Sequence, residues 1–159
     1  MKIIDNFLDE SDFILIKDLL MDSNFPWYFN SGILVEDNNY SHFQFTHSFY
    51  RNYKPESNYI EILNPIFLKI NPKAIIKVKA NLGTRMNEIE TTGMHTDYDF
   101  ECNTSIFYIN TNNGYTIFED GTKVESVANR FVTFNSLLKH SGTTHTDEQT
   151  RVVVNFNYF

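Results

Sequence analysis

The stretch GMHTDYDFE, residues 93–101, contains the triplet His95-Thr96-Asp97, and most of the chain beyond it alternates like short β-strands. Residues two apart in a strand point to the same side, so His95 and Asp97 can occupy neighbouring positions on one metal ion. The same three residue types recur at 145–147, in THTDEQTR. The sequence therefore offers two candidate metal motifs, and their surroundings have to decide between them.

From residue 74 onward the sequence predicts β structure. Short segments rich in β-branched and aromatic residues alternate with turns such as NTNNG and EDGT, which carry the Asn, Asp and Gly residues that tight turns prefer. These strands are expected to form a jelly roll, whose interior can hold a small ligand. The predicted strands span residues 74–82, 103–110, 115–119, 122–126, 130–136 and 151–158.

Two amphipathic helices are predicted within the first 73 residues, a region expected to support the β core. Residues 5–23 carry an apolar stripe at helical spacing, and either Asp9 or Ser11 can cap this helix. Residues 57–70 carry a second stripe, which Pro65 is expected to kink or divide.

A strand is predicted between the two helices, at residues 41–50. Its alternation places His47 on an aromatic face, where a packed core histidine is the expected role. The whole pattern predicts one mainly β domain, residues 1–159, with N-terminal helices and a cupin-like core at residues 74–159.

Composition and charge restrict the partners. The net charge of −7 disfavours a protein built to bind the nucleic-acid backbone. The single cysteine, Cys102, excludes an intramolecular disulfide and a thiolate zinc cluster, and it indicates a reducing compartment. Because no segment has the apolar length of a signal peptide or a membrane span, we expect a cytoplasmic monomer without membrane association.

Downstream of the first triplet, His140 follows the predicted strand 130–136, and Arg151 begins the last predicted strand. Two imidazoles and one carboxylate leave open positions on a metal, which suits Fe(II) in oxygen chemistry better than structural zinc. The arginine offers a bidentate clamp for a carboxylate. This combination favours a co-substrate that chelates at one end and carries a carboxylate at the other, the shape of 2-oxoglutarate.

The second triplet has no comparable set of additional ligands from other segments of the chain. Pairing His145 and Asp147 with His140 would draw all three ligands from one eight-residue loop, which has little packing to hold it. We interpret HTDEQT as a turn whose Thr and Asp side chains bond local backbone groups.

On these residues the chain resembles the Fe(II)/2-oxoglutarate-dependent oxygenases, in the branch similar to prolyl hydroxylases, and it resembles small members encoded by bacteriophages. The likeness covers residues 74–159 and also rests on SIFYIN (105–110) and NNGYTIFEDG (112–121). The eleven-residue step from His140 to Arg151 fits the family's spacing better than the six-residue step from His145.

The resemblance implies a double-stranded β-helix whose Fe(II) ligands are His95, Asp97 and His140. By the same likeness Arg151 and Tyr108 would bind the distal carboxylate of 2-oxoglutarate. Asn81 would also reach the co-substrate, although prolyl hydroxylases frequently have a tyrosine at its position.

The implied reaction couples oxidative decarboxylation of 2-oxoglutarate, to succinate and CO2, with hydroxylation of a C–H bond. O2 would be the second co-substrate and ascorbate a candidate reductant. A peptidyl proline is the leading substrate, with other peptides and small molecules left open and nucleic acid disfavoured. A phage-encoded member would act in the cytoplasm of the host cell. The alternatives are a cupin-type metalloprotein that does not use 2-oxoglutarate and a non-enzymatic β-sandwich interaction module.

Overall fold

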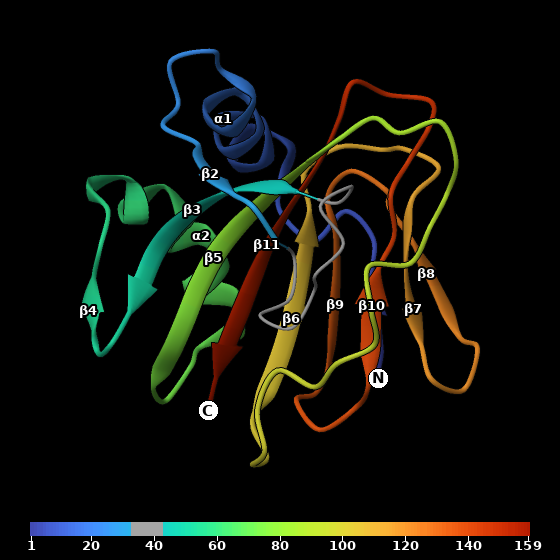
Figure 1. Ribbon diagram of the computed structural model, residues 1–159. Coiled ribbons are helices and arrows are strands. Elements are labelled where there is room, and N and C mark those ends of the chain that lie inside the picture. Colours follow the sequence, from blue (N-terminus) through green and yellow to red (C-terminus); the bar gives the residue numbers. More distant parts are fainter. Residues whose placement is uncertain (33–42) are drawn as a thin grey trace.

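The computed structural model describes residues 1–32 and 43–159, and it consists of two antiparallel sheets with helices packed on the outer face of the larger sheet (Figure 1). The predicted mainly β architecture with N-terminal helices is confirmed. Positions 41 and 42 of the predicted strand 41–50, which include His42, lie outside the described residues. None of the described helices is long and apolar enough to cross a membrane.

The N-terminal helices form where the apolar stripes predict them. Helix α1 spans Glu10–Met21, with Asp9 at its N-cap position but without a capping hydrogen bond from the Asp9 side chain. The second helical region is divided into a 3-10 helix, η1 (Asn58–Leu63), and helix α2 (Asn64–Ile70). Pro65 lies in the first turn of α2, where its missing N–H costs no intrahelical hydrogen bond, so it separates the two helices without breaking α2.

The larger sheet contains eight strands among the described residues, all paired antiparallel. Strand β11 lies near its middle, between β5 and β6, and β4 pairs with β3 at one edge. In spatial order, the strands are β1 (Lys2–Ile4), β9 (Arg130–Asn135), β6 (Asn103–Tyr108), β11 (Thr150–Tyr158), β5 (Ile75–Thr84), β3 (Gln44–Arg51) and β2 (Tyr28–Asn30), with β4 (Lys54–Pro55) beside β3.

The smaller sheet has the order β10 (His140–Gly142), β7 (Tyr115–Phe118) and β8 (Lys123–Glu125) within the described chain. The connection that follows β5 arches over one end of the molecule and then runs down beside β10 (Figure 1). Two isolated bridges, Thr91 to Thr143 and His95 to His140, pair this connection with β10 and the residue after it. The first His-Thr-Asp triplet therefore begins at the edge of the smaller sheet.

Both faces of the larger sheet are buried, because its strands alternate between two apolar clusters. One cluster contains Val152 and Val154 of β11 and packs against Ile16 and Leu20 of α1. The other contains Val153 and fills the space toward the smaller sheet. The residues of this second cluster are Ile106, Tyr108, Phe118, Val124, Val132, Phe134 and Val153. A site between the sheets is thus held from both sides by packed side chains.

Strands β1, β2, β4 and β10 were not predicted from the sequence. Each has only two or three residues, too few for alternation to be recognised. The six strands predicted after residue 74 all form at their predicted places, with small differences at their ends.

Replacement of Phe107 by alanine is expected to destabilise the fold by about 3–5 kcal/mol, because a buried aromatic side chain is lost and a cavity remains. Phe107 is fully buried on β6, and its ring meets Phe7, Phe13 and Phe131. Urea denaturation measures the change. Leu68→Ala, on the 82% exposed side chain of Leu68, is the control and should change the stability by less than about 0.5 kcal/mol. Equal effects of the two substitutions would contradict the assigned core.

Candidate metal centre

His95 and His140 lie opposite each other in antiparallel backbone pairing. The N–H of His95 donates to the carbonyl of His140 at 3.0 Å, and the N–H of His140 donates back to the carbonyl of His95 at 2.9 Å. This reciprocal pair brings the two rings to a centroid distance of 4.7 Å. The two imidazoles are therefore placed by main-chain hydrogen bonds rather than by flexible loops.

The Nε2 atoms of both rings are left free to bind a metal. Nδ1 of His95 lies 3.2 Å from the carbonyl oxygen of Gly93, and Nδ1 of His140 lies 3.0 Å from that of Leu138. A carbonyl can only accept, so in each neutral ring the hydrogen sits on Nδ1 and the lone pair on Nε2. This is the tautomer that a metal ligand requires.

Asp97 completes the set. Its Oδ1 lies 3.7 Å from Nε2 of His95 and 3.9 Å from Nε2 of His140, distances too long for hydrogen bonds. The three side chains each offer a ligand atom, and all three atoms lie within 4.8 Å of one another. Two imidazole nitrogens and one carboxylate oxygen with space between them fit Fe(II), which takes this donor set and retains open positions.

The second oxygen of Asp97 is held by two side chains that sequence reasoning did not single out. Oδ2 accepts a hydrogen bond from Thr104 at 2.8 Å and from the amide of Asn157 at 2.7 Å. The amide of Asn157 also donates to Thr104 at 3.0 Å. With Oδ2 engaged, Oδ1 is the oxygen that remains for a metal, and the carboxylate cannot rotate away from the two histidines.

Electrostatics keep Asp97 and His140 in the protonation states that metal binding needs. Burial acts to raise the pKa of Asp97, but the hydrogen bond from Asn157 and the nearby His140 and Lys77 outweigh it, and the pKa lies below the usual value. Burial lowers the pKa of His140. Asp97 is therefore ionised and His140 neutral near pH 7.

Arg151 lies on β11 and lines the same cavity. Its Nε donates to Ser126 at 2.9 Å, and its guanidinium lies 5.8 Å from the centre of the Tyr108 ring. It makes no ion pair with a carboxylate in the described chain, and its exposed part faces the cavity. A Cβ at Gly114 would lie 2.9 Å from Cδ of Arg151, so only glycine leaves room for this side chain.

Tyr108 and Asn81, the other two predicted co-substrate contacts, occupy different places. Tyr108 is fully buried behind the cavity, beneath Arg151, and its hydroxyl bonds Thr116 at 2.8 Å. Thr116 itself lines the cavity. Asn81 lines the cavity directly, and its Oδ1 is buried without a partner among the described residues. Contact of Tyr108 and Asn81 with a co-substrate stays a prediction.

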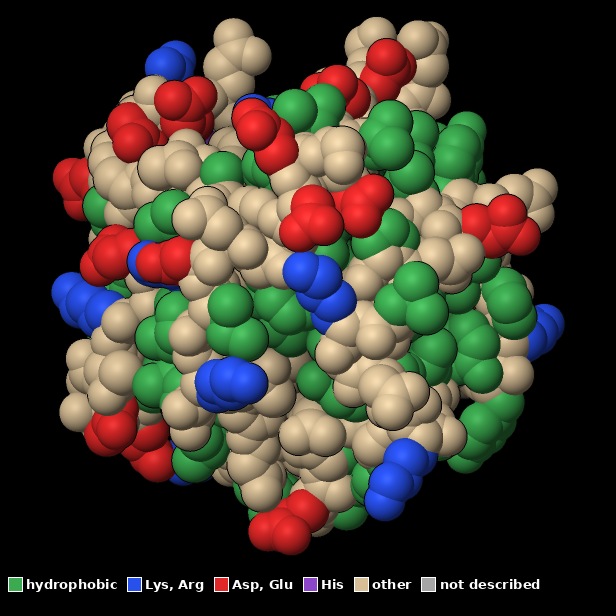
Figure 2. Space-filling view, turned by 180° about the vertical axis from the view of Figure 1, so that it is seen from behind, with side chains coloured by type: hydrophobic (Ala, Val, Ile, Leu, Met, Phe, Trp, Pro, Cys, Tyr) green, Lys and Arg blue, Asp and Glu red, His purple; other side chains and the backbone are tan. Residues whose placement is uncertain are grey.

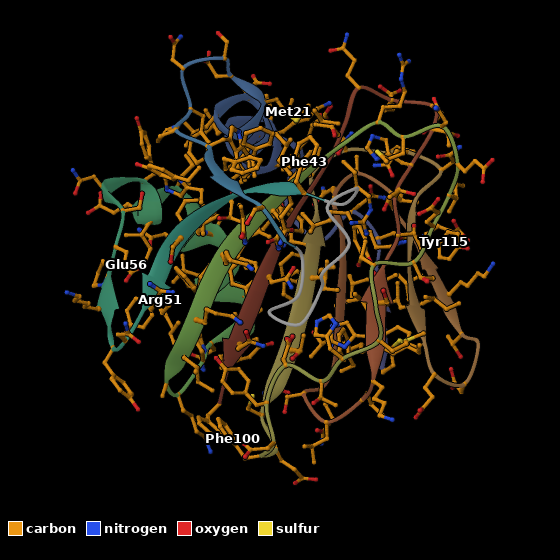
Figure 3. The ribbon with its side chains drawn as sticks, viewed as in Figure 1. Met21, Phe43, Arg51, Glu56, Phe100 and Tyr115 are labelled. Atoms are coloured by element: carbon orange, nitrogen blue, oxygen red, sulfur yellow. The ribbon has the colours of Figure 1, made fainter. Side chains whose placement is uncertain are left out.

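The cavity has a volume of about 300 Å³ and joins the three metal-ligand candidates to Arg151. That volume is at the lower end of the range for small-molecule sites, about 300–1,000 Å³. Phe43, which lies near the start of β3 (Figure 3), is also one of the residues that line the cavity. The three metal-ligand candidates and Arg151 thus line one cavity.

The second His-Thr-Asp triplet differs from its predicted role as a locally bonded turn. Asp147 accepts hydrogen bonds from the backbone N–H of Asn113, 34 residues away, and Thr146 bonds the Asn113 side chain. The triplet thus fastens the loop that carries Gly114 beside Arg151. The prediction failed because the partner lies on a segment that is distant in sequence.

His145 was also missed as a cavity residue. Its ring is 1% exposed and lines the cavity, and burial lowers its pKa. Neither ring nitrogen makes a hydrogen bond of ordinary geometry in the described chain, although the backbone of Glu148 and Gln149 lies close enough to influence the ring. It does not join the group formed by His95, Asp97 and His140.

No protein-family model matches the sequence, and a search of curated proteins finds no match. Solved structures do match over nearly the whole chain. A prolyl hydroxylase from Trichoplax adhaerens, in complex with a hypoxia-inducible-factor oxygen-degradation-domain peptide, aligns with a TM-score of 0.69 at 16% identity, covering 99% of this chain and 82% of that one. A 2OG-Fe(II) oxygenase family oxidoreductase from Burkholderia pseudomallei gives 0.70 at 12% identity, covering 98% and 83%.

The chain has the fold that these 2OG-Fe(II) oxygenase and prolyl hydroxylase structures share. A Pseudomonas putida prolyl-4-hydroxylase agrees, with a TM-score of 0.62 at 13% identity over 99% of this chain and 91% of that one. The predicted double-stranded β-helix is therefore confirmed. In this fold, the candidate metal centre lies between the two sheets, where the 91–97 segment pairs with β10.

Asn157→Ala is expected to weaken metal binding by about 10- to 100-fold, because Asp97 loses a partner that fixes its orientation. Isothermal titration of the protein with Mn(II) measures the affinity. Asn135→Ala is the matched control, since this exposed amide bonds only outside the cavity, to Glu101 and the backbone N–H of Leu137. Unchanged affinity in Asn157→Ala, with the protein folded, would refute the supporting role.

The metal-free protein should lose thermal stability as the pH falls from 7.5 to 5.5. Burial lowers the pKa of three histidines, His47, His140 and His145, below the value of about 6.5 that they have when unfolded. The unfolded chain then binds more protons in this range, so unfolding becomes more favourable as pH decreases. Unfolding midpoints measured with a chelator present test this. His47→Gln should reduce the dependence, and a flat profile in the wild type would contradict it.

Proposed function

We propose that the protein is an Fe(II)/2-oxoglutarate-dependent dioxygenase that hydroxylates a C–H bond. One observation carries the proposal. Two imidazoles and a carboxylate with converging free ligand atoms share a 300 Å³ cavity with Arg151, a guanidinium that has no carboxylate partner in the described chain.

His95, Asp97 and His140 would hold Fe(II). The bound iron, with O2, supplies the redox chemistry that couples decarboxylation of 2-oxoglutarate to substrate hydroxylation. The chain's part is to fix the ligands and exclude water. Thr104 and Asn157 orient the carboxylate, and the main-chain pairing of the histidines sets their separation.

Arg151 distinguishes this function from its alternatives. A buried cation without a counter-ion is costly, so a site that retains one is suited to an anionic ligand. The guanidinium can bind the distal carboxylate of 2-oxoglutarate through paired hydrogen bonds. A cupin-type enzyme that needs only a metal, or an interaction module without ligands, would have no use for this clamp.

A peptidyl proline is the first candidate substrate. Two of the similar structures are prolyl hydroxylases, and one of them holds a peptide. Identity of 16% or less supports this only as a starting point for a screen, since one fold serves many substrates. Ascorbate is proposed as the reductant, and a cytoplasmic monomer stays a prediction.

Anaerobic protein mixed with Fe(II) and 2-oxoglutarate is expected to show a metal-to-ligand charge-transfer band in the visible spectrum. Arg151→Met should raise the 2-oxoglutarate concentration for half-maximal absorbance about 30-fold or more, because one buried charged pair is lost. Succinate production should decline in parallel.

Lys139→Met is the control for charge, since this exposed lysine pairs with Glu119 outside the cavity and should leave the titration unchanged. His95→Ala and Asp97→Ala should abolish the band, whereas His145→Ala should retain it. Loss of the band in His145→Ala, with a normal band in His140→Ala, would overturn the ligand assignment.

A further inference from the structure

Strand β5 presents a polar row to the cavity. Lys77, Lys79 and Asn81 line the cavity, while Val78 and Ala80 between them are buried in the core under the helices. Because β5 lies between β11 and β3, these lysines project from the interior of the sheet and not from an edge. Lysines at such positions are uncommon unless their charge has a partner.

Among the described residues, residues 1–32 and 43–159, Lys79 has no such partner. Burial lowers its pKa, and Lys77 and Arg51 lower it further; Asp97 is the carboxylate that acts in the opposite direction. No carboxylate in the described parts of the chain lies within ion-pair distance of Lys79. Glu56 pairs instead with Arg51, toward the β3–β4 edge (Figure 3).

A neutral polar group lies next to Lys79. In the strand register, Lys79 is opposite Asn155 of β11, which also lines the cavity. Oδ1 of Asn155 is buried and makes no hydrogen bond to any described residue. An amide without fixed partners can turn its NH2 group toward an anion. Lysine, amide and a second lysine thus face the same space.

The charges of the described residues that line the cavity do not balance without a further anion. Asp97 is the one carboxylate among the described lining residues, against three cations, Arg151, Lys77 and Lys79. Bound Fe(II) and Arg151 together balance Asp97 and the two carboxylates of 2-oxoglutarate. The positive charges of the two lysines remain unbalanced, in a protein whose net charge is −7. On the face that Figure 2 shows, acidic and basic side chains are interspersed.

We propose that Lys79, with Lys77 and Asn155, binds an anionic group of the substrate, a carboxylate or a phosphate. This subsite rests on the proposed function, because it is defined as the part of the cavity that 2-oxoglutarate leaves open. A peptide substrate would carry an acidic side chain or a terminal carboxylate close to the oxidised residue. A small substrate would itself be an acid or a phosphate ester.

Three methyl-bearing probes test the subsite without knowledge of the substrate. The protein is loaded with Mn(II) and N-oxalylglycine, an unreactive analogue of 2-oxoglutarate, and the proton relaxation of acetate, methylphosphonate and acetamide is measured by NMR. Mn(II) accelerates the relaxation of a methyl group bound nearby. We expect saturable enhancement for at least one anion and none for neutral acetamide. The anion with the stronger effect distinguishes a carboxylate-bearing substrate from a phosphate-bearing one.

Lys79→Met is expected to reduce the affinity for the anion about tenfold or more, since a charged hydrogen bond is removed. Lys79→Arg should retain binding, and Lys139→Met, outside the cavity, should leave it unchanged. Lys79→Met should fold normally, with an unfolding midpoint equal to or above that of the wild type, because the lost charge has no ion pair in the described chain.

The relaxation experiment would overturn the subsite in any of three ways. Neither anion shows enhancement, acetamide relaxes as fast as the anions, or Lys79→Met binds the anions as well as the wild type, which would mean direct coordination to Mn(II). If Lys79→Met instead loses N-oxalylglycine, measured by calorimetry, the lysine belongs to the co-substrate site and the subsite is also rejected. Failure of the wild type to bind N-oxalylglycine would contradict the proposed function itself.

Discussion

The reciprocal hydrogen bonds between the main chains of His95 and His140 are the constraint on which the site depends. They join the connection after β5 to β10, two segments that have little regular structure of their own. Once this pair forms, both imidazoles lie on one side, and Asp97 follows two residues later with its backbone N–H bonded to Ser136 at 3.2 Å. The carbonyls of Gly93 and Leu138 then select the ring tautomer. The positions and the tautomers of the two imidazoles therefore arise from backbone geometry.

The larger sheet supplies the remaining parts of the site, because it is buried on both faces. Residues of β11 that point toward the helices are apolar, whereas those that point toward the cavity are Arg151, Asn155 and Asn157, with Val153 between them. One strand thus carries the clamp arginine, an amide of the proposed anion subsite and the amide that orients Asp97. A shift of β11 by one residue would exchange its polar and apolar faces, so apolar packing against the helices fixes the register on which the chemistry depends.

Much of this could be predicted from the sequence. Alternation along residues 151–158 is strong enough to separate the core face from the cavity face, and the order of His95, Asp97, His140 and Arg151 indicated the fold. The partners of Asp97 could not be predicted, because Thr104 and Asn157 reach it only through strand pairing. The hydrogen bond from the backbone N–H of Asn113 to Asp147 could not be predicted for the same reason. The positions of Lys77 and Lys79 on one face of a strand could be predicted, since polar residues alternate with apolar ones in IIKVKANL. The pattern alone does not show whether that face lines a cavity or is exposed to solvent.

The place of β11 also has a kinetic consequence. This strand lies between β5 and β6, and its pairing with β5 joins segments that are about seventy residues apart in the chain. Closing such large loops before any contact is gained makes folding slow, on the scale of milliseconds to seconds for β-rich topologies of this kind. Asn157 must meet Asp97 across sixty residues before the carboxylate is oriented. The full set of metal-ligand candidates is therefore oriented only in a chain whose larger sheet has already formed.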